Sequence, residues 1–238
     1  MPRKYLSIIL AYFFMTQVVA LLIIPLQKTT DIDPTYVMTY WNIFIFTVTL
    51  SLCLYYIRDE IREFFQLKDK QIGTIVMWSV IGVFLVFIAQ YASIVIETFL
   101  LGIQPGSENT MRLMDTARQA PAFLLIITLL GPILEELVFR KAIFGSLYRK
   151  MNFFFAGILS GLIFAALHDD FAHLLTYTAI GLVFAFLYVE TKRIIVPIIA
   201  HIALNTVAAV AQLSTDPEDI EQILDQFDQL QMILIGGF

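Results

Sequence analysis

Charged residues are scarce in this chain. They make up 15% of its 238 residues, whereas 59% are hydrophobic and 21 are phenylalanine. Together with a mean hydropathy of +0.80, this composition excludes an ordinary soluble globular domain. The net charge of −5 disfavours a nucleic-acid partner, so the lipid bilayer is the expected surroundings of the protein.

Cysteine is almost absent. The single Cys53 excludes a disulfide framework and any cysteine-rich metal site, and we interpret it as a small hydrophobic core residue. A cleaved signal peptide is also not expected. The apolar stretch 6–26 is too long for the hydrophobic region of a signal peptide and lacks a small-x-small cleavage site, so we interpret it as a retained span.

Long apolar runs predict an all-α, polytopic transmembrane bundle. At about 20 residues per crossing, roughly seven spans use most of the chain and leave no room for a separate soluble domain. The expected spans lie near 6–26, 38–57, 73–101, 121–140, 152–168, 172–189 and 194–213. We therefore expect a single membrane domain, 1–238, with N-terminal spans in 1–103, core spans in 120–213 and an acidic tail in 214–238. The segment 104–120 is predicted to be a polar loop or a short surface helix.

Lysine and arginine are distributed unevenly between the two ends of such a bundle. With seven spans, twelve fall on one side and three on the other, a positive-inside pattern that places the N-terminus in the cytoplasm and the C-terminus outside. The twelve are Arg3, Lys4, Arg58, Arg62, Lys68, Lys70, Arg140, Lys141, Arg149, Lys150, Lys192 and Arg193; the three are Lys28, Arg112 and Arg118. The expected location is a multi-pass position in a cell membrane.

The C-terminal tail contains neither lysine nor arginine from Asp216 onward. Its apolar residues recur at helical spacing from Ile220 to Leu230, which predicts an amphipathic helix. Such a helix either docks against the end of its own bundle, which we favour, or lies on the membrane surface.

Three polar clusters interrupt the apolar sequence of the predicted core spans. They are Glu135-Glu136-x-x-x-Arg140, Phe164-x-x-x-His168 and His201-x-x-x-Asn205. Ionisable groups at membrane depth are costly and by default mark a function. A carboxylate, two imidazoles and an amide are also the groups needed to activate a water molecule and stabilise an oxyanion. The sequence therefore predicts an enzyme built inside the membrane.

The first cluster divides into two roles. Glu136 and Arg140 are one turn apart in the favourable order and can pair along the helix, while Glu135 lies about 100° round the axis and is left for chemistry. The alternative is that both glutamates sit at a helix end and face water. Gly131-Pro132 precedes the cluster by one turn and removes a backbone hydrogen bond, which predicts a local kink near Glu135.

The other two clusters have their own alternatives. His168 follows a stripe of small residues, 157–165, that favours close helix packing, but it could instead be an interfacial histidine. His201 and Asn205 project from one helix face and could form only a structural hydrogen bond between helices. His173 remains a reserve candidate, and we interpret Glu97 and Gln90 as structural.

The expected spans place these residues at different depths. At about 1.5 Å per residue, Glu135 is far from the outer end of its span, whereas His168 is at the outer end of its own and His201 is near the inner end. Side chains that act together must meet. Either the span boundaries are shifted by a turn or two, or the fifth helix is tilted and begins deeper in the membrane.

Taken together and in this order, the three clusters resemble those of the CPBP family of intramembrane proteases. This family includes the type II CAAX prenyl endopeptidases and bacterial proteins of the Abi and lysostaphin-resistance-A-like types. The resemblance covers about residues 120–210 and implies a hydrolase of the CAAX protease type. It implies that Glu135 and His168 activate the water and that His201 and Asn205 stabilise the oxyanion, with Glu136, Arg140 and Phe164 as structural support.

Metal dependence stays open in this resemblance. Members are commonly labelled metalloproteases, but the chain has no His-Glu-x-x-His motif. Glu135, His168 and His201 would be the ligands of a divalent metal such as zinc, and we favour a metal-independent mechanism.

The expected function is peptide-bond hydrolysis in a small peptide or a lipid-anchored protein, in the plasma membrane of a bacterium. The alternative is a non-catalytic membrane protein that uses the same polar cavity for peptide binding, export or immunity. The lack of internal repeat symmetry disfavours a secondary transporter.

Overall fold

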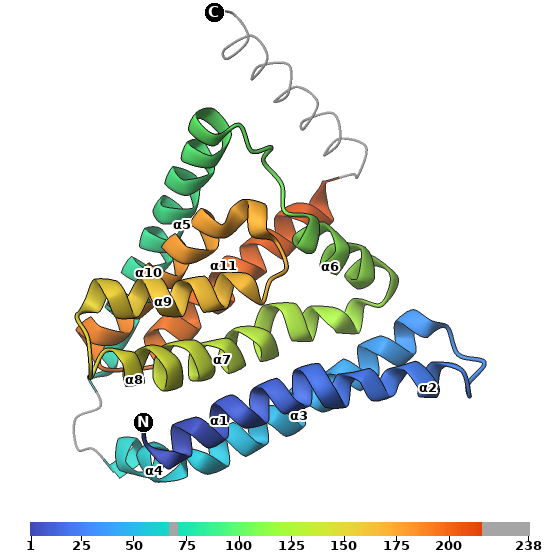
Figure 1. Cartoon of the computed structure of the whole chain (residues 1–238), viewed down its shortest axis with the longest axis horizontal. Coiled ribbons are helices and arrows are strands. Elements are labelled where there is room, and N and C mark those ends of the chain that lie inside the picture. The colour runs from blue at the N-terminus through green and yellow to red at the C-terminus, as the bar shows by residue number, and fades with distance from the viewer. Residues whose placement is uncertain (67–70, 216–238) are drawn as a thin grey trace, which may run out of the picture.

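The computed structural model describes residues 1–66 and 71–215, and every regular element among them is helical (Figure 1). Within these residues, six helical stretches are long and apolar enough to cross a membrane. They are Arg3–Gln27, Pro34–Tyr56, Ile72–Leu101, Pro121–Leu147, Phe171–Thr191 and Ile195–Ser214, and a seventh apolar helix, Phe153–Ala166, is shorter. The predicted all-α, multi-pass bundle is confirmed. The amphipathic helix predicted for the tail lies outside the described residues.

Two of the stretches change helix type along their length. The first runs through α1 (Arg3–Phe13), a π-helical turn η1 (Phe14–Val18), η2 (Val19–Leu22) and α2 (Ile23–Gln27). The fourth runs through η3 (Pro121–Phe123), the π-helical turn η4 (Ile126–Leu130), α7 (Gly131–Glu135), the π-helical segment η5 (Glu136–Phe144) and α8 (Gly145–Leu147). The remaining elements are α3 (Pro34–Tyr56), α4 (Arg58–Gln66), α5 (Ile72–Leu101), α6 (Glu108–Gln119), α9 (Phe153–Ala166), η6 (Phe171–His173), α10 (Leu174–Thr191) and α11 (Ile195–Ser214).

Polar side chains set several helix starts. Asp33, Ser107 and Asn152 each accept a hydrogen bond from a backbone N–H in the first turn of α3, α6 and α9, respectively. This satisfies one of the N–H groups that every helix N-terminus leaves without a partner. At the C-terminal end of α5, Gly102 takes a left-handed conformation with φ of 68°, as is common where a helix ends.

The segment 104–120 was expected to be a polar loop or a short surface helix. It contains α6.

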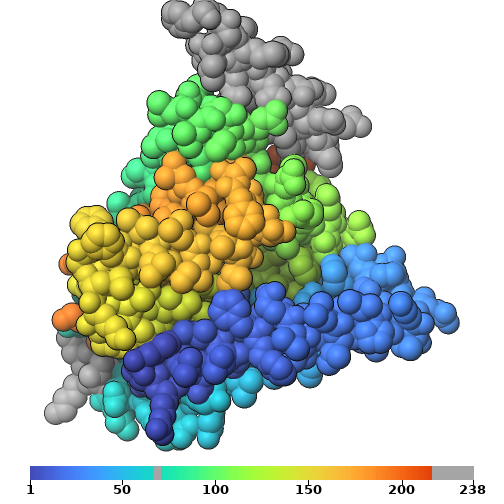
Figure 2. All heavy atoms as spheres, in the orientation of Figure 1, coloured from blue at the N-terminus to red at the C-terminus, as the bar shows by residue number. Residues whose placement is uncertain are grey.

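The bundle has two sides. On one side, α10 packs against both α5 and α9, and α11 packs against α5 and η4. On the other side, α1 packs against α3 and against η5 (Figure 1). Figure 2 shows α9, in yellow, beside the blue N-terminal helix, and Tyr12 and Phe164 share one buried hydrophobic cluster. The fourth stretch therefore lies between the two sides. Of its 18-residue apolar segment, 56% is buried.

The expected spans placed Glu135, His168 and His201 at different depths, and the short length of α9 explains how these side chains can meet. The 14 residues of α9 rise only about 21 Å, whereas the hydrocarbon core of a bilayer is about 30 Å thick. The helix starts at the same end of the bundle as α8 and stops partway along it (Figure 1). His168, just beyond its last turn, lines the same cavity as Glu135.

Small residues let α9 and α10 approach closely, as the sequence predicted. A Cβ atom added at Gly161 would lie 3.1 Å from Cγ2 of Thr178, and one added at Gly157 would lie 2.6 Å from a side-chain carbon of Leu182. The hydroxyl of Ser160 in the same stripe donates to the carbonyl of Phe139, at 3.1 Å. The stripe thus fixes α9 against both α10 and η5.

Ion pairs gather three basic segments at one end of the bundle. Glu60 of α4 pairs with Lys4 of α1 and with Lys141 of η5. Arg140 was counted among the twelve basic residues of this end, but it is only 1% exposed and lies inside the bundle. Without Arg140 the count is eleven against three, which still predicts a cytoplasmic N-terminus.

The orientation in the membrane is a prediction that cysteine labelling tests. In a Cys53→Ser background, we expect Glu63→Cys on α4 to be protected from a membrane-impermeant maleimide in intact cells. We expect Ser214→Cys at the end of α11, and Gln222→Cys in the tail, to react. The opposite pattern would reverse the orientation, and protection of all three would contradict an external C-terminus.

Candidate active site

The four residues predicted to carry the chemistry line one cavity of about 540 Å³ inside the bundle. They come from three separate parts of the chain. Glu135 ends α7, His168 follows α9, and His201 and Asn205 lie on α11. Side chains from α5, α6 and the first helical stretch complete the wall, so the N-terminal half of the chain encloses a set of residues that belongs to the C-terminal half.

Glu136 forms the centre of a buried ionic network. Its Oε2 lies 3.3 Å from Nε of Arg140, and its Oε1 accepts a hydrogen bond of 2.9 Å from Nδ1 of His201. The carboxylate is fully buried, so the alternative in which both glutamates face water does not describe this structure. The guanidinium of Arg140 lies between two rings, 4.5 Å from the centre of Phe164 and 5.0 Å from that of Phe184.

This network gives Glu136 a role that the sequence did not indicate. The predicted pair with Arg140 is present, and the same carboxylate also orients His201 from the neighbouring helix. The ring of Phe184 stacks on the other side of His201, with 4.7 Å between centres. His201 is thus held by one hydrogen bond and one ring contact.

Glu135 faces the cavity instead. Its side chain is 19% exposed, and its Oε2 is 3.7 Å from Nε2 of His201. That distance is too long for a hydrogen bond. The separation of about 100° between consecutive helical residues therefore sends Glu136 into the buried network and Glu135 toward the cavity, as predicted.

His168 is fixed by its own helix and by two aromatic rings. Its Nδ1 lies 2.8 Å from the carbonyl oxygen of Phe164. Because a carbonyl only accepts, Nδ1 carries a proton in this contact, which leaves Nε2 as the ring nitrogen available to the cavity. The ring lies 4.4 Å from that of Phe164 and 4.4 Å from that of Tyr177. Tyr177 was not predicted from the sequence. The chain has 31 phenylalanines and tyrosines, and nothing in the sequence around Tyr177 distinguishes it from the others as a site residue.

The irregular fourth stretch provides the partner of Asn205. In the π-helical turn η4, the N–H of Gly131 donates to the carbonyl of Ile126, five residues earlier. In that register the carbonyl of Ile127 faces residue 132, a proline without an N–H. Nδ2 of Asn205 donates to this free carbonyl at 3.0 Å. The structure thus has a π-helical turn directly before Gly131-Pro132, and the carbonyl of Ile127 holds Asn205 at the cavity. The kink predicted near Glu135 stays a prediction.

The candidate metal ligands Glu135, His168 and His201 line the same cavity. Among residues 1–66 and 71–215, no three His, Cys, Asp or Glu side chains come together in a way that could hold a metal ion. Glu135 approaches His201, with 3.7 Å between Oε2 and Nε2. We derive no step through a metal.

Comparison with known proteins identifies the group to which the chain is related. The model of the type II CAAX prenyl endopeptidase Rce1-like family matches residues 117–207. This range contains the four residues predicted to carry the chemistry, Glu135, His168, His201 and Asn205. The putative membrane peptidase YdiL of Bacillus subtilis is 39% identical over 246 residues, covering 100% of this chain and 99% of the relative. The membrane-embedded CAAX protease MroQ of Staphylococcus aureus is 32% identical over 248 residues, covering 99% of this chain and 100% of the relative. The chain belongs to the Rce1-like family of CAAX proteases.

This membership confirms the resemblance predicted from the three clusters. The protein is a CAAX-type protease and a multi-pass bacterial membrane protein. No solved structure matches the chain. The two bacterial relatives align along their full lengths, so the similarity extends beyond the core to the N-terminal helices that close the cavity.

Proposed function

We propose that this Rce1-like protease hydrolyses a peptide bond inside the membrane, in a small or membrane-associated peptide, with a water molecule activated by Glu135 and His168. The observation that supports this proposal is the position of four groups around one cavity: a partly exposed carboxylate, an imidazole that donates from Nδ1 to a carbonyl, a second imidazole and an amide. These groups match the needs of peptide hydrolysis by water.

In this mechanism the carboxylate of Glu135 removes one proton from the water. Nε2 of His168 accepts a hydrogen bond from the other O–H group of the water and so orients the water. The water oxygen attacks the carbonyl carbon of the scissile bond. When the resulting intermediate collapses, the C–N bond breaks and Glu135 returns its proton to the leaving nitrogen. Glu135 suits this role because it is the carboxylate that faces the cavity, whereas Glu136 is committed to Arg140 and His201.

The oxyanion formed in the attack is stabilised from α11. Asn205 uses one of its two amide hydrogens on Ile127 and keeps the other for the oxyanion. His201 donates from Nδ1 to the carboxylate of Glu136, which fixes the ring with Nε2 on the other edge. A proton on Nε2 would be donated to the oxyanion. Two fixed donors in a site that excludes bulk water are worth more than the same donors in water.

The cavity favours an uncharged stretch of peptide. No lysine or arginine is among the described residues that line it, and the titratable groups are the glutamate, the histidines and a few tyrosines. A volume of about 540 Å³ holds only a short extended segment. Among bacterial membrane peptides, leader and signalling peptides fit this description, and we propose them ahead of a lipid-anchored protein terminus.

Mass spectrometry of accumulated peptides tests the function. In the bacterium that produces this protein, replacing the wild-type chain by Glu135→Gln is expected to cause one or a few uncleaved precursors to accumulate. The matched control is Glu190→Gln, an exposed carboxylate at the end of α10. Identical peptide profiles for wild type, Glu135→Gln and control would contradict proteolysis at this site.

Single replacements separate oxyanion support from water activation. Asn205→Ala removes one donor, so turnover is expected to fall by about 10²–10³-fold with little change in substrate binding. His168→Ala is expected to cost more, because it removes part of the group that produces the nucleophile. Steady-state kinetics on the peptide identified by mass spectrometry measures both, and a larger loss for Asn205→Ala would reverse the assignment.

Chelation tests the metal-independent mechanism. We expect purified, active protein to keep its turnover in excess EDTA or 1,10-phenanthroline, because the proposed water activation uses only side chains of the protein itself. Elemental analysis of the same sample is the second measurement. Stoichiometric zinc that is lost together with activity, and whose return restores it, would overturn the mechanism.

A further inference from the structure

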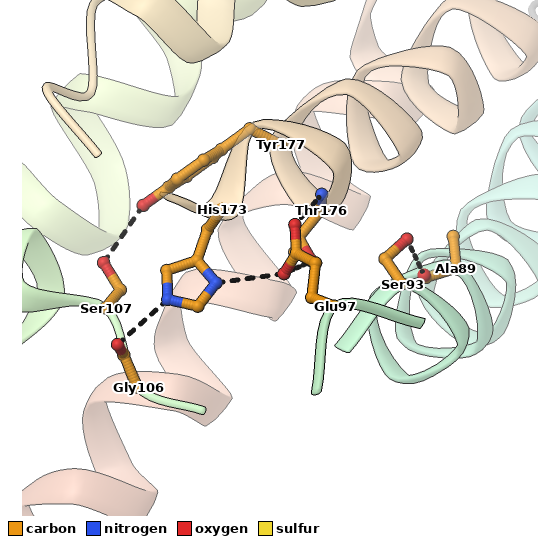
Figure 3. Close-up of polar contacts among 8 residues, drawn as sticks. All are labelled: Ala89, Ser93, Glu97, Gly106, Ser107, His173, Thr176 and Tyr177. Atoms are coloured by element: carbon orange, nitrogen blue, oxygen red, sulfur yellow. Dashed lines mark hydrogen bonds and ion pairs between the residues drawn. The ribbon is translucent and has the colours of Figure 1, made fainter. Parts of the chain in front are cut away.

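A second carboxylate–imidazole pair lies beside the cavity, outside the proposed catalytic set. It joins Glu97, near the end of α5, to His173, the last residue of η6 (Figure 3). Both residues are buried, Glu97 at 1% and His173 at 8% exposed. A charged pair buried at this point is costly, and nothing in the mechanism above uses it.

Glu97 caps a helix to which it does not belong. Its Oε1 accepts from the backbone N–H of Thr176 at 2.9 Å, and its Oε2 accepts from the Thr176 hydroxyl at 2.8 Å. The N–H of Thr176 is one of those at the start of α10 that have no partner within the helix. A carboxylate from α5 supplies that partner, in a position where the helix dipole also favours negative charge.

His173 extends the cluster to the connector between α5 and α6. Its Nδ1 is 2.9 Å from Oε2 of Glu97, and its Nε2 is 3.0 Å from the carbonyl oxygen of Gly106. Carbonyl oxygens and the oxygens of an ionised carboxylate only accept, so with Glu97 ionised both ring nitrogens donate, and we expect His173 to be an imidazolium. Asp170 adds a second negative charge near the ring, and Gly106 permits the connector's bend with φ of 112°.

Tyr177 carries the cluster to the catalytic cavity. It follows Thr176 directly, and its hydroxyl lies 3.3 Å from Oγ of Ser107, the residue after Gly106. The ring of the same side chain packs on His168. The centres of the two rings are 4.4 Å apart, and their planes are inclined by 31°. The start of α10 is therefore held at its backbone by Glu97, while Tyr177 is held at its hydroxyl by the connector (Figure 3).

We propose that Glu97, His173 and Thr176 form a positioning cluster that sets the ring of Tyr177 and, through it, the orientation of His168. The cluster connects α5, the α5–α6 connector and α10, three segments that all contribute to the cavity wall. The importance of this cluster for turnover rests on the proposed function, since it acts through His168. Its existence and its effect on His168 are independent of any substrate.

The replacement Glu97→Gln tests the charge at nearly constant size. The amide oxygen can still accept from the backbone of Thr176, but its NH₂ group cannot accept from His173 or from the Thr176 hydroxyl. We expect the second ring proton of His173 to be lost and the ring of Tyr177 to become mobile against His168. A misplaced His168 is expected to lower kcat by up to about 10²-fold with KM little changed.

Histidine NMR provides the decisive readout, because the chain has only three histidines. With ¹⁵N-histidine-labelled protein in detergent micelles at pH 7, each ring gives its own pair of nitrogen signals, which single histidine replacements assign. We expect His173 to show two protonated nitrogens and His168 to show the Nδ1–H neutral form. Glu97→Gln is expected to remove the double protonation of His173 and to shift or broaden the signals of His168.

Ser93→Ala is the matched control. Ser93 lies on α5 one turn before Glu97 and is also buried, but its hydroxyl donates to Ala89 within the same helix, at 2.8 Å (Figure 3). Its replacement is expected to leave all three histidines unchanged. If Glu97→Gln does not fold, Thr176→Val against Thr176→Ser gives the same comparison, since only serine keeps the hydroxyl that donates to Glu97.

Two results would overturn the proposal. A singly protonated His173 in the wild type would remove the charged pair, and unchanged His168 signals in Glu97→Gln or Thr176→Val would show that the cluster does not reach the cavity. A normal peptide profile in Glu135→Gln would instead contradict the proposed function and leave the NMR result standing. The two ideas therefore fail separately.

Discussion

Replacing Glu135 by glutamine is expected to reduce proteolysis by about 10²–10⁴-fold, the typical contribution of a general base, while the protein still folds and inserts. Glutamine keeps the size and hydrogen-bonding capacity of the side chain but cannot take a proton from water. Folding should be unaffected, because the carboxylate makes no hydrogen bond to another side chain among residues 1–66 and 71–215 and lies 3.7 Å from Nε2 of His201. Turnover and thermal unfolding of the purified variant measure the two effects separately.

The control for this replacement is Glu190→Gln, which removes an exposed carboxylate on α10 and should change neither quantity. Normal turnover by Glu135→Gln would remove Glu135 from the mechanism. A loss of folding would mean that Glu135, like Glu136, stabilises the buried network.

Replacing Glu136 by glutamine is expected to destabilise the protein by about 3–5 kcal/mol, the usual cost of leaving one partner of a buried ion pair alone. Arg140 is 1% exposed and its guanidinium otherwise contacts the rings of Phe164 and Phe184, so its charge would lose its direct ionic partner inside the bundle. The glutamine oxygen still accepts from Nδ1 of His201. Denaturant or thermal unfolding in detergent measures the loss, and turnover should fall as well because His201 loses a charged partner.

The double replacement Glu136→Gln/Arg140→Met separates the two roles of Glu136. Removing both charges is expected to restore much of the stability, whereas activity should stay low because the carboxylate next to His201 is still missing. Stability equal to wild type in Glu136→Gln alone would contradict the buried pair. Full activity in the double replacement would show that His201 needs no carboxylate.

Most of the candidate site was predictable, because local spacing determines which residues share a helix face. The four-residue spacing of Glu136 and Arg140 predicted their pair, and the position of Glu135 one residue earlier predicted that it points elsewhere. The spacing of His201 and Asn205 placed them on one face in the same way. The partners of these residues lie on other helices, so no spacing along the chain could reveal that Glu136 also holds His201 or that Asn205 binds a carbonyl freed by Pro132.

The length of the fifth apolar helix is the part of the span prediction that the structure refines, since Phe153–Ala166 is shorter than the six helices long enough to cross a membrane. Hydropathy identified the apolar helix near 152–168, but apolar character does not show whether a helix crosses the bilayer or stops inside a bundle. The backbone ends α9 at Ala166, and the depth of His168 follows from that end. A helix can stop inside a membrane protein only where its last carbonyls find partners. The carbonyl of Phe164 accepts from the N–H of Leu167 and from the His168 ring, and that of Ala165 accepts from the N–H of His168.

The sequence alone determined that this protein is an all-α membrane protein, which residues form its polar clusters and to which family it belongs, because composition, periodicity and motif order are local properties. Only the tertiary structure decided which residues meet. Glu97 and His173 are 76 positions apart, and Tyr177 touches His168 across the turn between two helices. Such contacts depend on the angles and depths at which helices pack, and these are set by many weak side-chain contacts at once rather than by any one segment.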